Sequence, residues 1–120
     1  MAKILAVDDS RTMRDMVTQT LQTAGHEVTG AADGEEGLAR ARTGRYDLVL
    51  TDVNMPKKDG ITLVRELRQL PNYRFTPILV LTTEGGGDMK NAGRQAGATG
   101  WIVKPFDPQK LLAVMGKVLG

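Results

Sequence analysis

Residues 48–60 read LVLTDVNMPKKDG, and this stretch decides the fold of the chain. A short, uninterrupted apolar run stands directly before Thr51-Asp52 and a loop rich in turn-forming residues. Apolar runs of this length, without alternating polar residues, are typical of strands that are buried on both faces of a sheet. The stretch therefore predicts a central strand that ends at an acidic residue.

Similar runs recur along the chain and alternate with helical patterns. Short apolar segments occupy residues 4–7, 78–81 and 101–103, and a weaker strand is expected at 27–31. Between them, apolar residues recur at helical spacing: Met13, Met16, Val17, Leu21 and Ala24; Leu63, Val64 and Leu67; Leu111, Leu112, Met115 and Leu119. The order is a strand followed by a helix, repeated five times. It predicts an α/β fold built on an open, doubly wound parallel sheet with helices on both faces.

The expected helix ends carry signals of their own. Asp33 with Glu36 three residues later is typical of a capping box, and Asp107-Pro108 places a capping acid before a proline in the first turn. Gly25 and Gly44 lie where the first two helices should end. These signals agree with the alternation of strands and helices.

Glycine is concentrated around the expected fourth helix. Six of the fourteen glycines, at positions 85, 86, 87, 93, 97 and 100, lie where this helix should begin and end. A glycine inside a helix costs ~1 kcal/mol relative to alanine. Residues 85–87 also lack the lysine and hydroxyl residue that follow a nucleotide-binding loop. We therefore expect a flexible connection and a marginal helix, whose amides exchange faster than those of the first helix.

Length and composition exclude several classes of protein. The chain has 120 residues, 41% hydrophobic and 25% charged, so we expect one domain, residues 1–120, that acts on its own. Cysteine is absent and His26 is the lone histidine, which excludes a disulfide framework, a thiol nucleophile and a histidine metal cluster. No apolar run approaches the ~18 residues of a membrane span, so we expect a cytoplasmic protein without a membrane partner.

Charge is distributed unevenly along the chain. The net charge is only +2 but the pI is 9.1, a value that can indicate nucleic-acid binding. Residues 1–56 carry six basic and nine acidic side chains, whereas residues 57–120 carry ten basic and five acidic ones. The basic residues are dispersed, with few aromatic residues between them to stack on bases. We therefore expect no nucleic-acid partner.

Polar residues follow each of the main expected strands. In an open parallel sheet, ligands bind beyond the carboxyl ends of the strands. The residues at those ends are Asp8-Asp9, Thr51-Asp52, Thr82-Thr83-Glu84 and Lys104-Pro105. Two ionised carboxylates roughly 4 Å apart repel each other by about 4 kcal/mol at an effective dielectric constant of about 20. Lys104 supplies one counter-charge, and a hard divalent cation with oxygen ligands, naturally Mg²⁺, would supply the rest.

Each of these acids taken alone is better explained as a helix N-cap. That explanation is weaker for Asp52, because a turn-rich loop and not a helix follows it directly. Lys104 alone could be a solvated lysine, yet it stands between a buried strand and a proline at the same edge of the sheet. The joint occurrence of these residues favours a functional site.

Four stretches together resemble the receiver domains of two-component signalling: KILAVDDS, LTDVNMPKKDG, ILVLTTE and GWIVKPF. The resemblance runs from Lys3 to Leu119 and is greatest to stand-alone, CheY-like chemotaxis regulators. It implies the flavodoxin-like (βα)5 fold with strand order 2-1-3-4-5. It also implies a response regulator, not an enzyme in the usual sense, whose Asp52 accepts a phosphoryl group from a phosphohistidine of a histidine kinase.

The resemblance assigns roles to the residues at the strand ends. Phosphotransfer would be carried by Asp52, Thr82 and Lys104. Mg²⁺ would be held by Asp9 and Asp52 directly, by Asp8 through water, and by the backbone carbonyl of Asn54. Each role suits the residue type, because phosphoryl transfer needs positioning and charge stabilisation more than a strong base.

The resemblance also implies a switch and a short phosphoryl lifetime. Thr82 would move toward the phosphoryl group and make space for an aromatic ring, here Trp101. Tryptophan is bulkier than the aromatic residue usual at this position. A large apolar residue that covers the sheet would explain Trp101 equally well. The peptide between Lys104 and Pro105 would be cis and aim the lysine at the pocket. Asn54 and Glu84 would flank an attacking water, so we expect rapid self-dephosphorylation.

The implied output is binding of a target by the fourth helix, fifth strand and fifth helix. The segment expected to form this surface lies in the basic second half of the chain and carries Lys90, Arg94, Lys110 and Lys117. We therefore expect a monomer that binds an acidic protein such as the flagellar motor switch. A phosphorelay intermediate or phosphate sink is the alternative within signalling.

Two other classes of protein fit the sequence less well. A Mg²⁺-dependent aspartyl-phosphate phosphatase usually needs a second acid where Asn54 stands. A flavin module is disfavoured by the acidic loop at residues 8–11, which would repel an FMN phosphate.

Overall fold

The computed structural model describes residues 2–55, 57–82, 87–104 and 107–119, and for residues 87–89 the backbone alone. Within these residues, five strands form one parallel sheet in the order β2-β1-β3-β4-β5. They are β1 (Lys3–Val7), β2 (Glu27–Ala31), β3 (Leu48–Asp52), β4 (Ile78–Thr82) and β5 (Gly100–Val103). The predicted fold class and strand order are confirmed.

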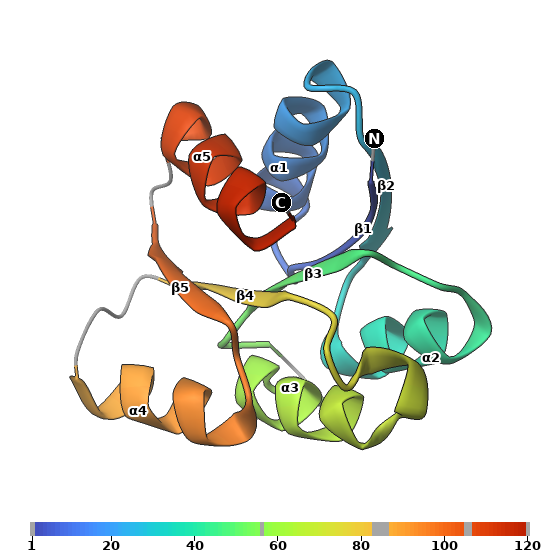
Figure 1. Ribbon diagram of the computed structural model, residues 1–120, viewed down its shortest axis with the longest axis vertical. Helices are drawn as coiled ribbons and strands as arrows, with labels where there is room; N and C mark the ends of the chain where they lie inside the picture. Colours follow the sequence, from blue (N-terminus) through green and yellow to red (C-terminus); the bar gives the residue numbers. More distant parts are fainter. Residues whose placement is uncertain (1, 56, 83–86, 105–106, 120) are drawn as a thin grey trace.

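Helices cover both faces of this sheet. They are α1 (Arg11–Thr23), α2 (Gly34–Thr43), α3 (Gly60–Gln69), α4 (Gly87–Ala96) and α5 (Pro108–Leu119), with a short 3-10 helix, η1 (Pro71–Tyr73), before β4. α1 and α5 lie on one face and α2, α3 and α4 on the other (Figure 1). In the described part of the chain, no helix is long and apolar enough to cross a membrane.

The two faces of the sheet bury two separate apolar clusters. In β1, Ile4 and Ala6 pack beneath α1 and α5, whereas Leu5 and Val7 pack beneath α2 and α3. β4 alternates in the same way, with Leu79 and Leu81 on the first face. Burying one such side chain contributes about 1.5–3 kcal/mol. Because both faces are covered, residues 4–7 of β1 and 78–81 of β4 are all apolar, which explains the uninterrupted runs in the sequence.

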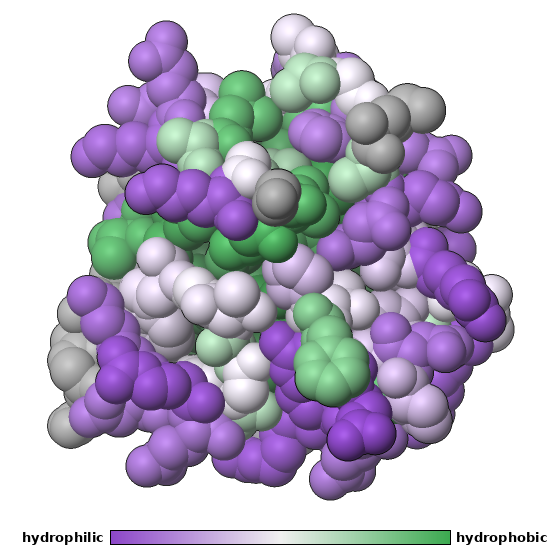
Figure 2. Space-filling view, viewed as in Figure 1, coloured by the Kyte–Doolittle hydropathy of each residue, from purple (hydrophilic) through white to green (hydrophobic). Residues whose placement is uncertain are grey.

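Met16 is an exception to the expected helical pattern. Val17 and Leu21 of α1 are buried, but Met16 is 50% exposed. Met16 stands one residue before Val17, so its side chain is turned about 100° around the helix axis from that of Val17. It lines a cleft of about 470 Å³ with Pro108 and Leu112 of α5. Figure 2 shows apolar side chains gathered between α1 and α5, above a mostly hydrophilic surface over α2, α3 and α4.

The predicted helix starts are present. Asp33 Oδ1 accepts a hydrogen bond from the Glu36 amide at 2.8 Å, and Glu36 reaches back to the Ala32 amide, one residue before the usual capping-box partner. At the start of α5, Asp107 Oδ1 accepts from the Gln109 amide at 2.9 Å. These local bonds stabilise the first turns of α2 and α5, as the sequence indicated.

The predicted helix ends differ in their mechanism. Gly25 follows α1 with a φ of +93°, a left-handed conformation that favours glycine. Gly44 ends α2 in an extended conformation, with φ −125°, so its role is not left-handed capping. A Cβ at Gly44 would lie 3.2 Å from the ring of Tyr46, and glycine therefore leaves space for that ring.

The glycines around α4 have separate roles. Gly87 and Gly93 lie within α4, Gly97 ends it with a φ of +111°, and Gly100 begins β5. Gly85 and Gly86 lie outside the described residues. The expected mobility of this segment therefore stays a prediction.

Gly60, the first residue of α3, touches the end of β3. A Cβ at this position would lie 1.9 Å from the Asp52 carbonyl oxygen. The Gly60 amide also donates to the Val53 carbonyl at 2.8 Å. The absence of a side chain thus allows α3 to begin directly against the backbone that carries Asp52.

We expect Gly60→Ala to destabilise the protein by about 2–3 kcal/mol, because the new methyl group overlaps the Asp52 carbonyl and the backbone must shift. Gly116→Ala is the matched control: Gly116 lies inside α5, and among the described residues no atom outside that helix's own backbone lies within 4 Å of the added Cβ. This control should gain about 0.5–1 kcal/mol from helix propensity. Urea unfolding of both variants measures the two effects, and a Gly60→Ala protein as stable as wild type would contradict the close approach.

Candidate functional site

The register of the sheet brings four predicted side chains to one edge. Val7 pairs with Thr51 across β1 and β3, so Asp8 and Asp52 are the next residues on neighbouring strands. Thr82 pairs with Val103 across β4 and β5, and the Lys104 amide donates to the Thr82 carbonyl at 2.6 Å. The carboxyl ends of β1, β3, β4 and β5 therefore meet as the sequence predicted.

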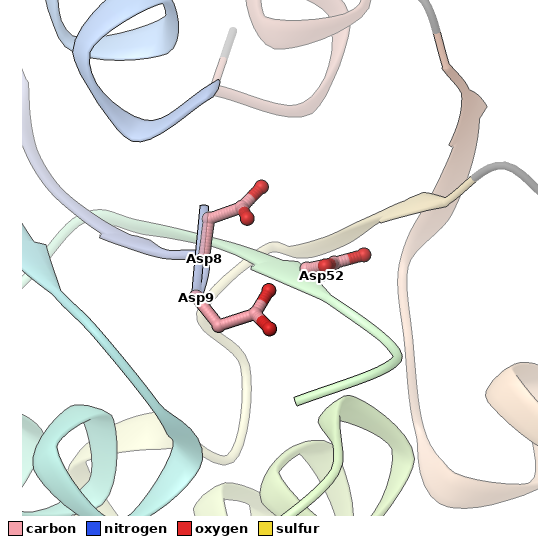
Figure 3. A group of neighbouring side chains, drawn as sticks. All are labelled: Asp8, Asp9 and Asp52. Carbon is pink, nitrogen blue, oxygen red and sulfur yellow. The ribbon is translucent and has the colours of Figure 1, made fainter. Parts of the chain in front are cut away.

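Three carboxylates form the centre of this edge. Oxygen atoms of Asp8, Asp9 and Asp52 lie within 4.8 Å of one another. Figure 3 shows Asp8 and Asp9 at the end of β1 and Asp52 at the end of β3, with all three side chains pointing to the same side. Asp8 and Asp52 are buried, 4% and 9% exposed, whereas Asp9 is exposed. A ligand therefore reaches the cluster from the side of Asp9.

The Lys104 ammonium lies between the two buried carboxylates. Its Nζ is 3.1 Å from Asp8 Oδ2 and 3.2 Å from Asp52 Oδ1, and the side chain is only 10% exposed. One positive charge leaves the group of three carboxylates with an excess of negative charge. Carboxylate oxygens in this number fit a hard divalent cation, and Mg²⁺ is the expected one.

Both carboxylate oxygens of Asp8 have partners. Its Oδ1 accepts from the Ser10 amide at 2.9 Å, while Oδ2 is engaged by Lys104. Ser10 was not predicted as part of the site. A serine directly before a helical pattern is a typical N-cap, and Ser10 is the N-cap of α1: its hydroxyl accepts a hydrogen bond from the Met13 amide.

The carboxyl group of Asp52 is destabilised in its charged form. Burial raises the pKa of Asp52 above its ordinary value, and the neighbouring Asp8 charge raises it further. Lys104 and the Val53 amide, which donates to Oδ1 at 2.8 Å, oppose this shift without cancelling it. A cation bound beside Asp52 would favour the ionised form.

Thr82 ends β4, and Trp101 lies near the start of the neighbouring strand β5. Thr82 is fully buried. The Trp101 ring packs against α4, where a Cβ at Gly93 would lie 2.7 Å from its Cζ3 atom. In the described part of the chain, the buried Trp101 Nε1 has no hydrogen-bond partner. The position of the ring therefore depends on packing and not on a polar contact.

The remaining predicted residues are placed less fully. Asn54 is exposed in the loop after β3, two residues beyond Asp52. Glu84 and Pro105 lie outside the described residues, so the predictions made for them and for the peptide preceding Pro105 stay predictions.

Comparison with known proteins places this geometry in context. A family model described as a response regulator receiver domain matches residues 4–115. Chemotaxis protein CheY1 of Helicobacter pylori is 40% identical over 120 residues, covering 98% of this chain and 97% of that protein. The transcriptional regulatory protein PhoP of Bacillus subtilis is 38% identical, and the chain spans only 48% of its length.

Two solved structures are similar over nearly the whole chain. Chemotaxis protein CheY4 of Vibrio cholerae has a TM-score of 0.96 and 53% identity, with 99% of each chain covered. The receiver domain of the sensor histidine kinase PA1611 of Pseudomonas aeruginosa has a TM-score of 0.93 and 31% identity, covering 99% of this chain and 98% of its own. That receiver domain holds a magnesium ion in its active-site cleft.

We expect Asp52→Asn to be more stable than wild type at pH 7 without divalent cations, and the difference to vanish below about pH 4. Because its pKa is raised, native Asp52 keeps its proton to higher pH than the unfolded chain does, so wild-type stability falls as the pH rises through this range. Urea midpoints between these pH values measure the effect.

Asp15→Asn is the matched control for this measurement, since Asp15 is exposed on α1 and its stability difference from wild type should stay small across the same pH range. A wild-type protein that is more stable than Asp52→Asn at pH 7 would show that the charged form is favoured.

Proposed function

Because this chain belongs to the response regulator receiver domain family, we propose that Asp52 accepts a phosphoryl group from a phosphohistidine of a histidine kinase. The observation that carries the proposal is the Lys104 ammonium between Asp8 and Asp52, beside three converging carboxylates. This arrangement offers a carboxylate nucleophile and a cation for phosphoryl oxygens in one buried place.

The contacts of Asp52 suggest which oxygen reacts. Lys104 and the Val53 amide both contact Oδ1. In the described part of the chain, this leaves Oδ2 to attack the phosphorus atom. The new O–P bond forms as the P–N bond of the phosphohistidine breaks, and the imidazole nitrogen leaves with the electron pair of that bond. Lys104 would then pair with a phosphoryl oxygen, and the Thr82 hydroxyl would donate to another.

The acidic residues divide between direct and indirect cation contacts. Asp9 and Asp52, with the Asn54 carbonyl, would hold Mg²⁺ directly. Asp8, whose two oxygens accept from the Ser10 amide and Lys104, would act through water. When bound, Mg²⁺ supplies positive charge to the phosphoryl oxygens. The magnesium ion in the PA1611 receiver domain supports this choice of metal.

The output proposed is a change of the surface formed by α4, β5 and α5. Movement of Thr82 toward the phosphoryl group would let the Trp101 ring shift from its place against Gly93 and alter this surface. Lys90 and Arg94 line a cleft of about 180 Å³ beside Trp101, and Lys110 and Lys117 are exposed on α5. Such a surface fits an acidic protein target. Similarity to the chemotaxis proteins supports the flagellar motor switch as that target.

A second candidate is a phosphorelay intermediate or phosphate sink. It is favoured by the similarity to PA1611, whose receiver domain belongs to a sensor histidine kinase. In this case the phosphoryl group passes to a histidine phosphotransfer protein, and no motor protein is bound.

We expect a small phosphodonor such as acetyl phosphate to label the protein stoichiometrically in Mg²⁺, and Asp52→Asn to abolish the label because the nucleophilic oxygen is replaced. Asp15→Asn, which removes an exposed acid of α1, should label like wild type. Mass spectrometry of intact protein measures both. Decay of the label over hours would contradict the short lifetime expected from Asn54 and Glu84.

We expect the phosphorylated protein, and not the unphosphorylated one, to retain an acidic flagellar motor switch protein in a pull-down, because phosphorylation changes the α4-β5-α5 surface. Charge reversal at Lys90 and Arg94 should weaken this retention by at least about tenfold, since two rim cations face the target. Arg74→Glu, an exposed arginine near η1, is the control. Retention of a histidine phosphotransfer protein alone would favour the phosphorelay.

A further inference from the structure

Arg14 makes a contact that the proposed phosphotransfer does not use. It lies in the second turn of α1, and its Nη1 donates to the backbone carbonyl of Asp8 at 2.7 Å. A charged donor at this distance makes one of the stronger kinds of hydrogen bond in proteins. Arg14 is half-buried and borders the small space behind Asp8 and Asp52.

Gly30 makes room for the arginine. A Cβ at Gly30 would lie 3.2 Å from Arg14 Cδ, tighter than ordinary van der Waals contact. Gly30 pairs with Ala6 of β1, two residues before Asp8. The aliphatic part of Arg14 therefore lies along the backbone of β2, and its guanidinium reaches the end of β1.

With this contact, every polar group of Asp8 has a partner. Its amide donates to the Ala31 carbonyl at 3.0 Å, and its carbonyl accepts from Arg14. Its carboxylate oxygens accept from the Ser10 amide and from Lys104. Four hydrogen-bond contacts therefore fix Asp8 at the end of β1.

The Asp8 carbonyl belongs to the peptide group that joins Asp8 to Asp9. That group is planar, so holding its oxygen also fixes the direction of the Asp9 amide and the place of the Asp9 Cα. Asp9 is the exposed member of the three carboxylates and the one from whose side a cation enters. The orientation of this peptide decides where the Asp9 carboxylate can reach.

We propose that Arg14 is a positioning residue for the divalent cation: by holding the Asp8–Asp9 peptide, it aims the Asp9 carboxylate at the ion. This proposal rests on the metal site of the proposed function. Positioning by Arg14 would raise the affinity for the cation, whereas the positive charge of its guanidinium alone would lower that affinity by repulsion. Removing the side chain should weaken binding if it positions Asp9, and strengthen binding if it acts only as a charge.

The test is a calorimetric Mg²⁺ titration of the full chain without phosphodonor. We expect Arg14→Met to weaken Mg²⁺ binding by about tenfold or more, the effect typical of groups that orient metal ligands. The methionine keeps an apolar stem over Gly30 but removes the donor. Arg11→Met is the matched control on the same helix, because Arg11 is exposed and pairs with Asp15 at 3.9 Å. It should bind Mg²⁺ within about twofold of wild type.

A second measurement separates positioning from loss of stability. In the absence of Mg²⁺, the Asp8 amide, which donates from the end of β1 to the Ala31 carbonyl, should exchange faster in Arg14→Met than in wild type, while amides in the middle of β3 keep their protection. If Arg14→Met does not fold, Arg14→Gln carries the same expectations, because its amide is too short to reach the Asp8 carbonyl. Mg²⁺ affinity equal to or tighter than wild type in the folded variant overturns the proposal.

The two proposals fail in different ways. If wild type shows no Mg²⁺ binding in this titration, the metal site of the proposed function is wrong. If wild type binds Mg²⁺, Asp9→Asn does not, and Arg14→Met binds as wild type does, the role given to Arg14 alone is wrong.

Discussion

Repulsion between carboxylates at one edge of the sheet is the constraint on which the rest of the structure depends. Asp8 and Asp52 are both buried, and the Lys104 ammonium lies within 3.2 Å of each. Two ionised acids buried side by side are unfavourable: burial and the Asp8 charge both raise the pKa of Asp52. The Lys104 ammonium therefore stabilises the carboxylates at this edge. Because three carboxylates face one lysine, a further positive charge is favoured on the side of Asp9.

The doubly covered sheet supplies the rigidity that this edge requires. Its two apolar clusters fix the strands from both faces, and the parallel register places the strand ends side by side. Backbone contacts then tie the ends to the helices: Gly60 sets α3 against the Asp52 carbonyl, and Arg14 reaches from α1 to the Asp8 carbonyl. Both contacts act on the main chain that carries the acids, so the helices control the direction of the carboxylates.

The same edge connects to a surface of different character. Trp101 of β5 packs against Gly93 of α4, and this packing, without a polar contact in the described residues, sets the position of its ring. A ring held in this way can move at little cost in hydrogen bonding. Beyond it lie the cations of α4 and α5, whose charge is opposite to that of the pocket. The uneven charge along the sequence thus corresponds to an acidic pocket and a surface rich in cations on one small fold.

The sequence by itself determined the alternation of strands and helices, the caps at Asp33 and Asp107, and the acids and lysine at the strand ends. These follow from local patterns, since burial on both faces demands apolar runs and parallel strands bring their carboxyl ends together. Only the tertiary structure decided the contacts of Arg14 with Asp8, Gly60 with Asp52 and Trp101 with Gly93, as well as the exposure of Met16. Each depends on how closely two packed elements approach, a distance set by the whole core and absent from any local pattern.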